Sequence, residues 1–142
     1  MKLEVIICGT GRDGTLSVAE MVREAFRINS INKTVCHEYE AGKFHDLFCE
    51  LREKKCDNAL KKIKNLISDC PYEVIVGNGY AAILEMFADQ YPNVRLIHLM
   101  RRDKQEFIKS FSKMARLNPD TNVYYSCANG GARRVAAFHV GS

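Results

Sequence analysis

The sequence predicts an α/β fold in which a parallel sheet is covered by helices on both faces. Short, continuously apolar runs, such as residues 5–8 and 74–76, alternate along the chain with segments of helical period. Strands that are apolar on both faces are typical of parallel sheets buried between helices. A chain of 142 residues with 46% hydrophobic and 27% charged residues has the size and composition of one soluble domain.

The first half of the chain predicts two strands and three helices. A strand over residues 3–8 leads into a glycine-rich turn and an amphipathic helix. That helix is indicated by apolar residues spaced at i, i+3, i+4, i+7 and i+8, namely Val18, Met21, Val22, Ala25 and Phe26. A short second strand follows at residues 34–37, and helical patterns resume around residues 44–51 and 60–67.

The second half predicts two more strands and then a loss of pattern. The third strand, residues 72–76, ends in a Gly-Asn-Gly turn, and a helix around Ile83 ends before Pro92. A fourth strand covers residues 94–100, and Phe107, Ile108, Phe111 and Met114 line a last helix. We therefore expect one domain over residues 1–117 and a tail over residues 118–142 that is poorly ordered or locally attached.

A glycine-rich loop after the first strand is the strongest functional signal, with the residues Gly9, Thr10, Gly11, Arg12, Asp13, Gly14 and Thr15. Glycines let the backbone approach an anion, and the following helix offers free N–H groups to a phosphate. The first and last of these glycines have P-loop spacing, but the Lys-Ser/Thr pair of that motif is missing. All three also fit the dinucleotide-binding pattern, with Glu38 or Glu40 available for a ribose. The loop therefore predicts phosphate binding without choosing the ligand.

A second signal follows the fourth strand. Arg102 leaves the end of that strand, Asp103 opens the next helix, and Ser110 lies eight residues after Arg102. Ligands of parallel sheets bind at the carboxyl ends of the strands. Arg102 and Ser110 are therefore expected to close on one anion beside the glycine-rich loop.

The loop and the Arg/Ser pair together resemble the sulfotransferase superfamily, whose donor is 3′-phosphoadenosine 5′-phosphosulfate (PAPS). The 5′-phosphosulfate loop of that family reads roughly K/R-S-G-T and is matched by residues 12–15, Arg-Asp-Gly-Thr. Its 3′-phosphate motif, an Arg followed eight residues later by a Ser, is matched by Arg102 and Ser110. The turn and strand over residues 87–99 also look like the segment that leads to this Arg. The resemblance covers residues 3–115.

The resemblance implies a role for each matched residue. The backbone of residues 11–15, with the hydroxyls of Thr15 and Thr10, would hold the 5′-phosphate. Arg12 would stabilise charge on the bridging oxygen as the sulfuryl group leaves. Arg102 and Ser110 would bind the 3′-phosphate, and this chemistry requires no metal.

The acceptor hydroxyl or amine needs a general base, and His37 and Glu38 are the best candidates because they follow the second strand beside the loop. A packed or capping histidine, and a salt bridge from Glu38 to Arg12, are the structural alternatives. The sequence departs from the family pattern at Asp13, which replaces a Ser and could cap the following helix. It departs again at Lys104, which replaces a Pro.

These observations predict a three-layer P-loop-type domain with a sheet of order 2-3-1-4 and the phosphate loop after the first strand. The function predicted is PAPS-dependent sulfuryl transfer. The alternatives are an inactive nucleotide-binding or interaction module of the same ancestry, apparently shortened at the C-terminus, and a P-loop kinase or NTPase. A net charge of +4 suits an anionic ligand but not nucleic acid. Without a membrane span or signal peptide, we expect a cytoplasmic protein; the sequence leaves open whether it forms a homo-oligomer.

Overall fold

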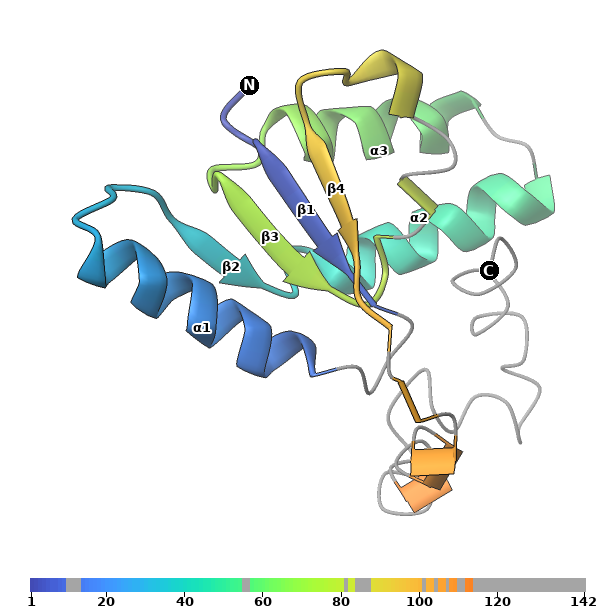
Figure 1. Cartoon of the computed structure of the whole chain (residues 1–142). Coiled ribbons are helices and arrows are strands. Elements are labelled where there is room, and N and C mark those ends of the chain that lie inside the picture. Colours follow the sequence, from blue (N-terminus) through green and yellow to red (C-terminus); the bar gives the residue numbers. More distant parts are fainter. Residues whose placement is uncertain are drawn as a thin grey trace.

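The computed structural model describes residues 1–9, 14–54, 57–80, 82–83, 88–100, 102–103, 105–106, 108–109 and 112–113. Its elements are β1 (Val5–Cys8), α1 (Thr15–Ile28), β2 (Val35–His37), α2 (Ala41–Lys54), α3 (Asp57–Ser68), β3 (Val74–Gly77), the 3₁₀ turn η1 (Ala88–Gln90) and β4 (Arg95–His98). The four strands form one parallel sheet in the order β2-β3-β1-β4 (Figure 1). The predicted fold class and strand order are both confirmed.

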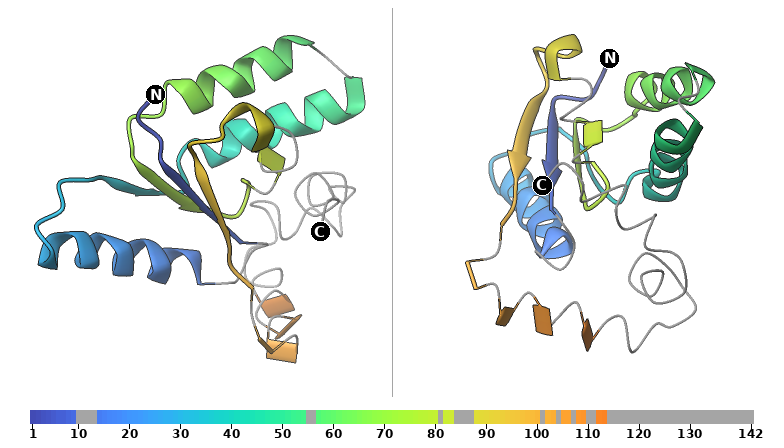
Figure 2. Two further views of the ribbon diagram at one scale, coloured as in Figure 1. Left: turned by 45° about the horizontal axis from the view of Figure 1, so that its top comes forward. Right: turned by 90° about the vertical axis from the view of Figure 1, so that its right-hand side faces the viewer.

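Helices cover both faces of the sheet, with α1 on one side and α2 and α3 on the other (Figure 2). Side chains of successive strand residues point to opposite faces, so each central strand supplies both cores. On the α1 side, Ile7, Val74 and Val76 pack around Ala19 of the helix. On the other side, the sheet packs against buried residues of α2 and α3, including Phe44, Phe48, Ile63 and Ile67.

The strands are slightly shorter than their apolar runs. β4 has only four residues, where the sequence predicts a strand over residues 94–100. Among the described strands it lies at the edge and pairs with β1 alone, from Val5 opposite Arg95 to Cys8 opposite His98, so that its four residues match the four of β1. Three of the four residues of β4 are exposed, including Ile97.

Two of the predicted elements lie partly outside the described residues. In the helix around Ile83, residues 82–83 are helical and residues 84–87 are not described. In the last helix, the described residues between 105 and 113 are helical. Asp103 opens that helix as expected, because its Oδ1 accepts hydrogen bonds from the N–H groups of Gln105 (2.9 Å) and Glu106 (3.2 Å). Residues 114–142 are outside, so the boundary at 117 stays a prediction.

Candidate functional site

Backbone hydrogen bonds connect the carboxyl ends of β1, β2 and β3 at the same end of the sheet. The N–H of Gly9, directly after β1, donates to the carbonyl of Gly77 at the end of β3 (3.2 Å). The N–H of Glu38, directly after β2, donates to the carbonyl of Val76 (2.8 Å). These bonds place the start of the glycine-rich loop and the candidate base on either side of the end of β3. The fold therefore places Gly9 and Glu38, two of the predicted site residues, at the same end of the sheet.

Helix α1 begins at this end of the sheet. Its N-cap is Gly14, which has a left-handed backbone (φ 79°) that favours glycine. Gly14 therefore stands in the N-cap position that the sequence suggested for Asp13, which lies outside the described residues. A helix leaves its first N–H groups without intrahelical partners, and the first turn of α1 contains no acidic residue. This end of α1 suits an anion.

The first residue of α1 is linked to the residue that ends β2. Thr15 is buried, and its Oγ1 lies 3.1 Å from Nε2 of His37. The same ring nitrogen lies 3.6 Å from Oε1 of Glu38. The hydroxyl, imidazole and carboxylate thus form a continuous series of polar groups from the first residue of α1 to the turn after β2. The two candidate bases are neighbours in space as well as in sequence.

Glu38 is held in an unusual conformation and environment. Its backbone is left-handed (φ 60°), a conformation that is strained for a residue with a side chain. Its Oε1 accepts a hydrogen bond from the N–H of Asn78 (3.3 Å). Burial raises the pKa of the Glu38 carboxyl, and this exceeds the lowering by His37 and by the Asn78 N–H. A carboxylate with a raised pKa is a stronger base than an exposed one.

Gly77 and Tyr80 form the wall behind this carboxylate. A Cβ at Gly77 would lie 2.9 Å from the Tyr80 ring and 3.2 Å from Oε1 of Glu38. Tyr80 is fully buried, packs edge-on against Phe44 and donates its hydroxyl to the carbonyl of Tyr39 (2.6 Å). Only a glycine fits between the tyrosine ring and the carboxylate without a shift of one of them.

Asn78 is a site residue that the sequence reasoning did not select. Its N–H contacts Glu38, and in the described part of the chain its buried Oδ1 has no hydrogen-bond partner. Buried polar atoms are normally paired. Its position directly after a buried strand, at the edge where parallel sheets bind ligands, was the signal that could have found it.

The remaining predicted residues are placed less fully. Arg102 is exposed and lies four residues after the end of β4, which is the strand next to β1. Thr10, Gly11, Arg12, Asp13 and Ser110 lie outside the described residues, so their predicted contacts stay predictions. Cys8, at the end of β1, is buried, and burial raises its thiol pKa to about 11; it packs as a small apolar residue.

Among the described residues, no three His, Cys, Asp or Glu side chains gather in a way that could hold an ion. Nor does any helix in the described ranges have the length and apolar character needed to cross a membrane.

The sheet order, the glycine-rich loop after the central strand and the uncapped α1 define a P-loop-type α/β domain. Residues 4–136 match the family model of the sulfotransferase domain. The match covers most of the chain, so the protein belongs to the sulfotransferase domain family. No curated protein gives a significant match.

Proposed function

We propose that this domain transfers a sulfuryl group from PAPS to a hydroxyl or amine of an acceptor molecule. Family membership supports the reaction class. The geometry of the site supports the assignment of donor binding to the start of α1 and of proton transfer to the residues after β2. The observation that carries the proposal is the chain of Thr15, His37 and Glu38, which joins a phosphate-binding position to a candidate base.

The described residues at the start of α1 fit a phosphate. The first turn carries N–H groups without intrahelical partners and the hydroxyl of Thr15, and no described atom lies within 4 Å of a Cβ placed on Gly14. PAPS supplies an activated sulfuryl group and a leaving oxygen that gains negative charge. We assign the 5′-phosphate to the loop over residues 9–15, the charge on the leaving oxygen to Arg12, and the 3′-phosphate to Arg102 with Ser110. Loss of one such electrostatic contact lowers the rate by roughly 10²–10³-fold.

The acceptor must lose a proton as it forms the new bond to sulfur. We assign this proton to Glu38 or to its neighbour His37. Burial brings the pKa of Glu38 closer to neutrality, where a general base is most effective while still ionised. The sulfuryl group moves to the acceptor oxygen or nitrogen, the bond to the leaving oxygen breaks, and the proton passes to the base.

Calorimetric titration with adenosine 3′,5′-bisphosphate tests the donor site. We expect micromolar binding to the wild-type protein and a loss of at least tenfold in Arg102→Ala, because a charge-assisted phosphate contact contributes about 1.5–3 kcal/mol. Arg95→Ala is the matched control, since Arg95 is exposed at the opposite end of β4. Tighter binding of ATP with Mg²⁺ than of the bisphosphate would contradict the proposal and favour a kinase or NTPase.

Transfer of ³⁵S-labelled sulfate from PAPS to a panel of phenol, alcohol, sugar and amine acceptors tests turnover. We expect one acceptor class to be labelled and Glu38→Gln to abolish most of the labelling. Bisphosphate binding without transfer to any acceptor would instead identify the domain as an inactive nucleotide-binding module.

A further inference from the structure

The short contact between Thr15 and His37 has two mutually exclusive hydrogen-bond arrangements. A threonine hydroxyl has one hydrogen to donate, whereas an imidazole nitrogen either donates or accepts. At 3.1 Å, the Thr15 hydroxyl therefore donates to a bare Nε2, or Nε2–H donates to Oγ1 of Thr15. In the first arrangement the hydroxyl hydrogen is already used. In the second it is free for another acceptor.

The proposed ligand and one neighbouring side chain both favour the second arrangement. A phosphate group on the first turn of α1 presents acceptor oxygens and needs the Thr15 hydrogen. Oε1 of Glu38, 3.6 Å from the same nitrogen, is also an acceptor and attracts a hydrogen on Nε2. Both a bound phosphate and the adjacent carboxylate therefore select a His37 ring that carries its hydrogen on Nε2.

We infer that His37 is a positioning residue: its Nε2–H holds the Thr15 hydroxyl so that the hydroxyl hydrogen points to the donor phosphate. This inference rests on the proposed function, because it assumes that Thr15 contacts the donor. It also separates the two candidate bases. A nitrogen that carries a hydrogen cannot take up another proton, so Nε2, the ring nitrogen that faces Thr15 and Glu38, is not the base while the donor is bound. Among the three groups at this contact, the Glu38 carboxylate is then the one left to take up the acceptor proton.

The pairing is tested by calorimetry with adenosine 3′,5′-bisphosphate on Thr15→Val, His37→Phe and the double variant. We expect Thr15→Val to weaken binding by roughly tenfold or more and His37→Phe by roughly three- to tenfold, the range for a lost hydrogen bond. The double variant should bind no more weakly than Thr15→Val, because the imidazole acts only through the hydroxyl. Thermal unfolding of each variant shows that it is folded at the titration temperature.

His37→Gln separates positioning from catalysis. The glutamine amide retains an N–H donor in reach of Thr15 but is not a general base. We expect it to restore the bisphosphate affinity to within about threefold of wild type and to keep most of kcat, as a donor that only makes a hydrogen bond should. The ¹⁵N shifts of His37 in the bisphosphate complex should show hydrogen on Nε2.

The outcomes distinguish this inference from the proposal beneath it. If Thr15→Val leaves the bisphosphate affinity unchanged, the donor is not held at α1 and the proposed function loses its donor site. If Thr15→Val weakens binding but His37→Phe does not, only the positioning role is overturned. A bare Nε2 in the complex, or an inactive His37→Gln that binds donor normally, would overturn it as well and return the role of base to His37.

Discussion

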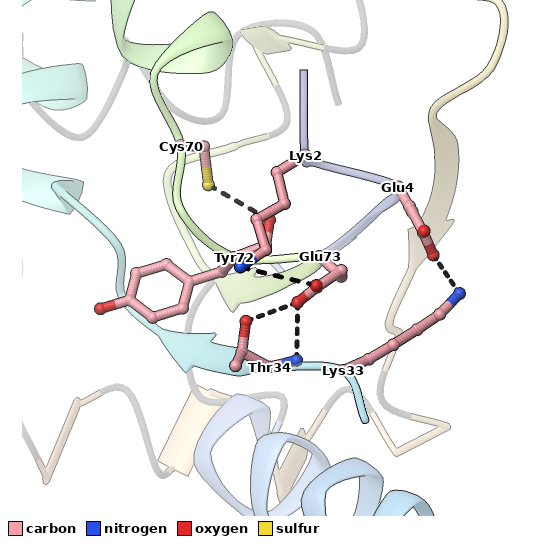
Figure 3. Close-up of polar contacts among 7 residues, drawn as sticks. All are labelled: Lys2, Glu4, Lys33, Thr34, Cys70, Tyr72 and Glu73. Atoms are coloured by element: carbon pink, nitrogen blue, oxygen red, sulfur yellow. Dashed lines mark hydrogen bonds and ion pairs between the residues drawn. The ribbon is translucent and has the colours of Figure 1, made fainter. Parts of the chain in front are cut away.

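The two ends of the parallel sheet shift the pKa of a glutamate in opposite directions. At the amino end, Oε2 of Glu73 accepts hydrogen bonds from the N–H (2.7 Å) and the hydroxyl (2.5 Å) of Thr34, and Lys2 lies nearby (Figure 3). These contacts, led by the hydroxyl, lower the pKa of Glu73 to about 2. At the carboxyl end, burial raises the pKa of Glu38. The Glu73 carboxylate at the amino end is stabilised by hydrogen bonds, whereas burial destabilises the ionised form of Glu38 at the carboxyl end.

The two ends of α1 repeat this contrast. At its C-terminus, the N–H of Ile31 donates to the carbonyl of Phe26 (2.8 Å) and that of Ser30 to the carbonyl of Arg27 (3.2 Å). These two bonds form a Schellman motif, which closes the helix end. At its N-terminus, Gly14 provides no side-chain cap. Polar groups are satisfied internally where the fold is only structural and left open where a ligand is expected.

The largest expected effect is that of Glu38→Gln on kcat, because this substitution removes the charge that distinguishes the carboxyl end of the sheet from the amino end. Loss of a positioned base lowers kcat by roughly 10²–10⁴-fold, while the glutamine carbonyl still accepts the N–H of Asn78. Because the folded-state pKa is raised, ionisation of Glu38 opposes folding as pH rises above the ordinary carboxyl pKa of 4.5. At neutral pH the variant should therefore be more stable than wild type in urea, and the difference should disappear below that pKa. A destabilised variant would show that this carboxylate is structural.

Gly77→Ala tests the wall behind Glu38. The new methyl group would lie 2.9 Å from the buried Tyr80 ring, so we expect a loss of about 1–3 kcal/mol of unfolding free energy, as for overpacked cores. Gly42→Ala is the matched control, because Gly42 lies in α2 with nothing within 4 Å of the added atom. It should gain about 0.5–1 kcal/mol. Equal effects at the two glycines would contradict the tight packing at Gly77.

Glu73 should govern the acid end of the stability profile. Its pKa is lowered in the folded state, so its contribution is fully present above the unfolded pKa of 4.5 and is lost as pH falls toward about 2. Glu73→Gln should flatten the decrease in urea midpoint over that range. Glu24→Gln is the control: the pKa of Glu24 is also lowered, by Arg27, but that ion pair is exposed and contributes little. A profile that is unchanged in Glu73→Gln would assign the acid sensitivity to other carboxylates.

The architecture was predictable because its signals are local and repeated. Continuous apolar runs and helical periods indicated the strands and the helices, and the order β2-β3-β1-β4 was expected from the P-loop-type domain that the resemblance implied. Strand ends were less predictable, because β4 ends where β1, its partner among the described strands, ends. The run over residues 94–100 says nothing about that pairing. An edge strand is defined by its neighbour as well as by its own side chains.

The site was predictable as a set of positions but not as a set of contacts. The ends of the predicted strands placed His37 and Glu38 beside the loop, and in the structure the backbone N–H groups of Glu38 and Gly9 both donate to residues at the end of β3. The link from Thr15 to His37 joins residues 22 positions apart and depends on how α1 packs, which no motif encodes. Asn78 was missed because an amide in a Gly-Asn-Gly turn is an ordinary turn residue until its buried, unpaired oxygen is seen.

The smallest expected effects come from substituting the residues with a left-handed backbone at the two ends of α1. Ser30 has a left-handed backbone (φ 54°) in the position after the helix where glycine is preferred. Ser30→Gly should therefore raise the unfolding free energy by about 0.5–1 kcal/mol without changing bisphosphate affinity. Gly14→Ala is the converse, because a side chain at φ 79° is strained; it should lower stability by a similar amount and also weaken bisphosphate binding. Urea unfolding and calorimetry on both variants measure the two quantities. If Gly14→Ala changes stability alone, the open end of α1 is only a turn, and the contrast between its ends carries no functional meaning.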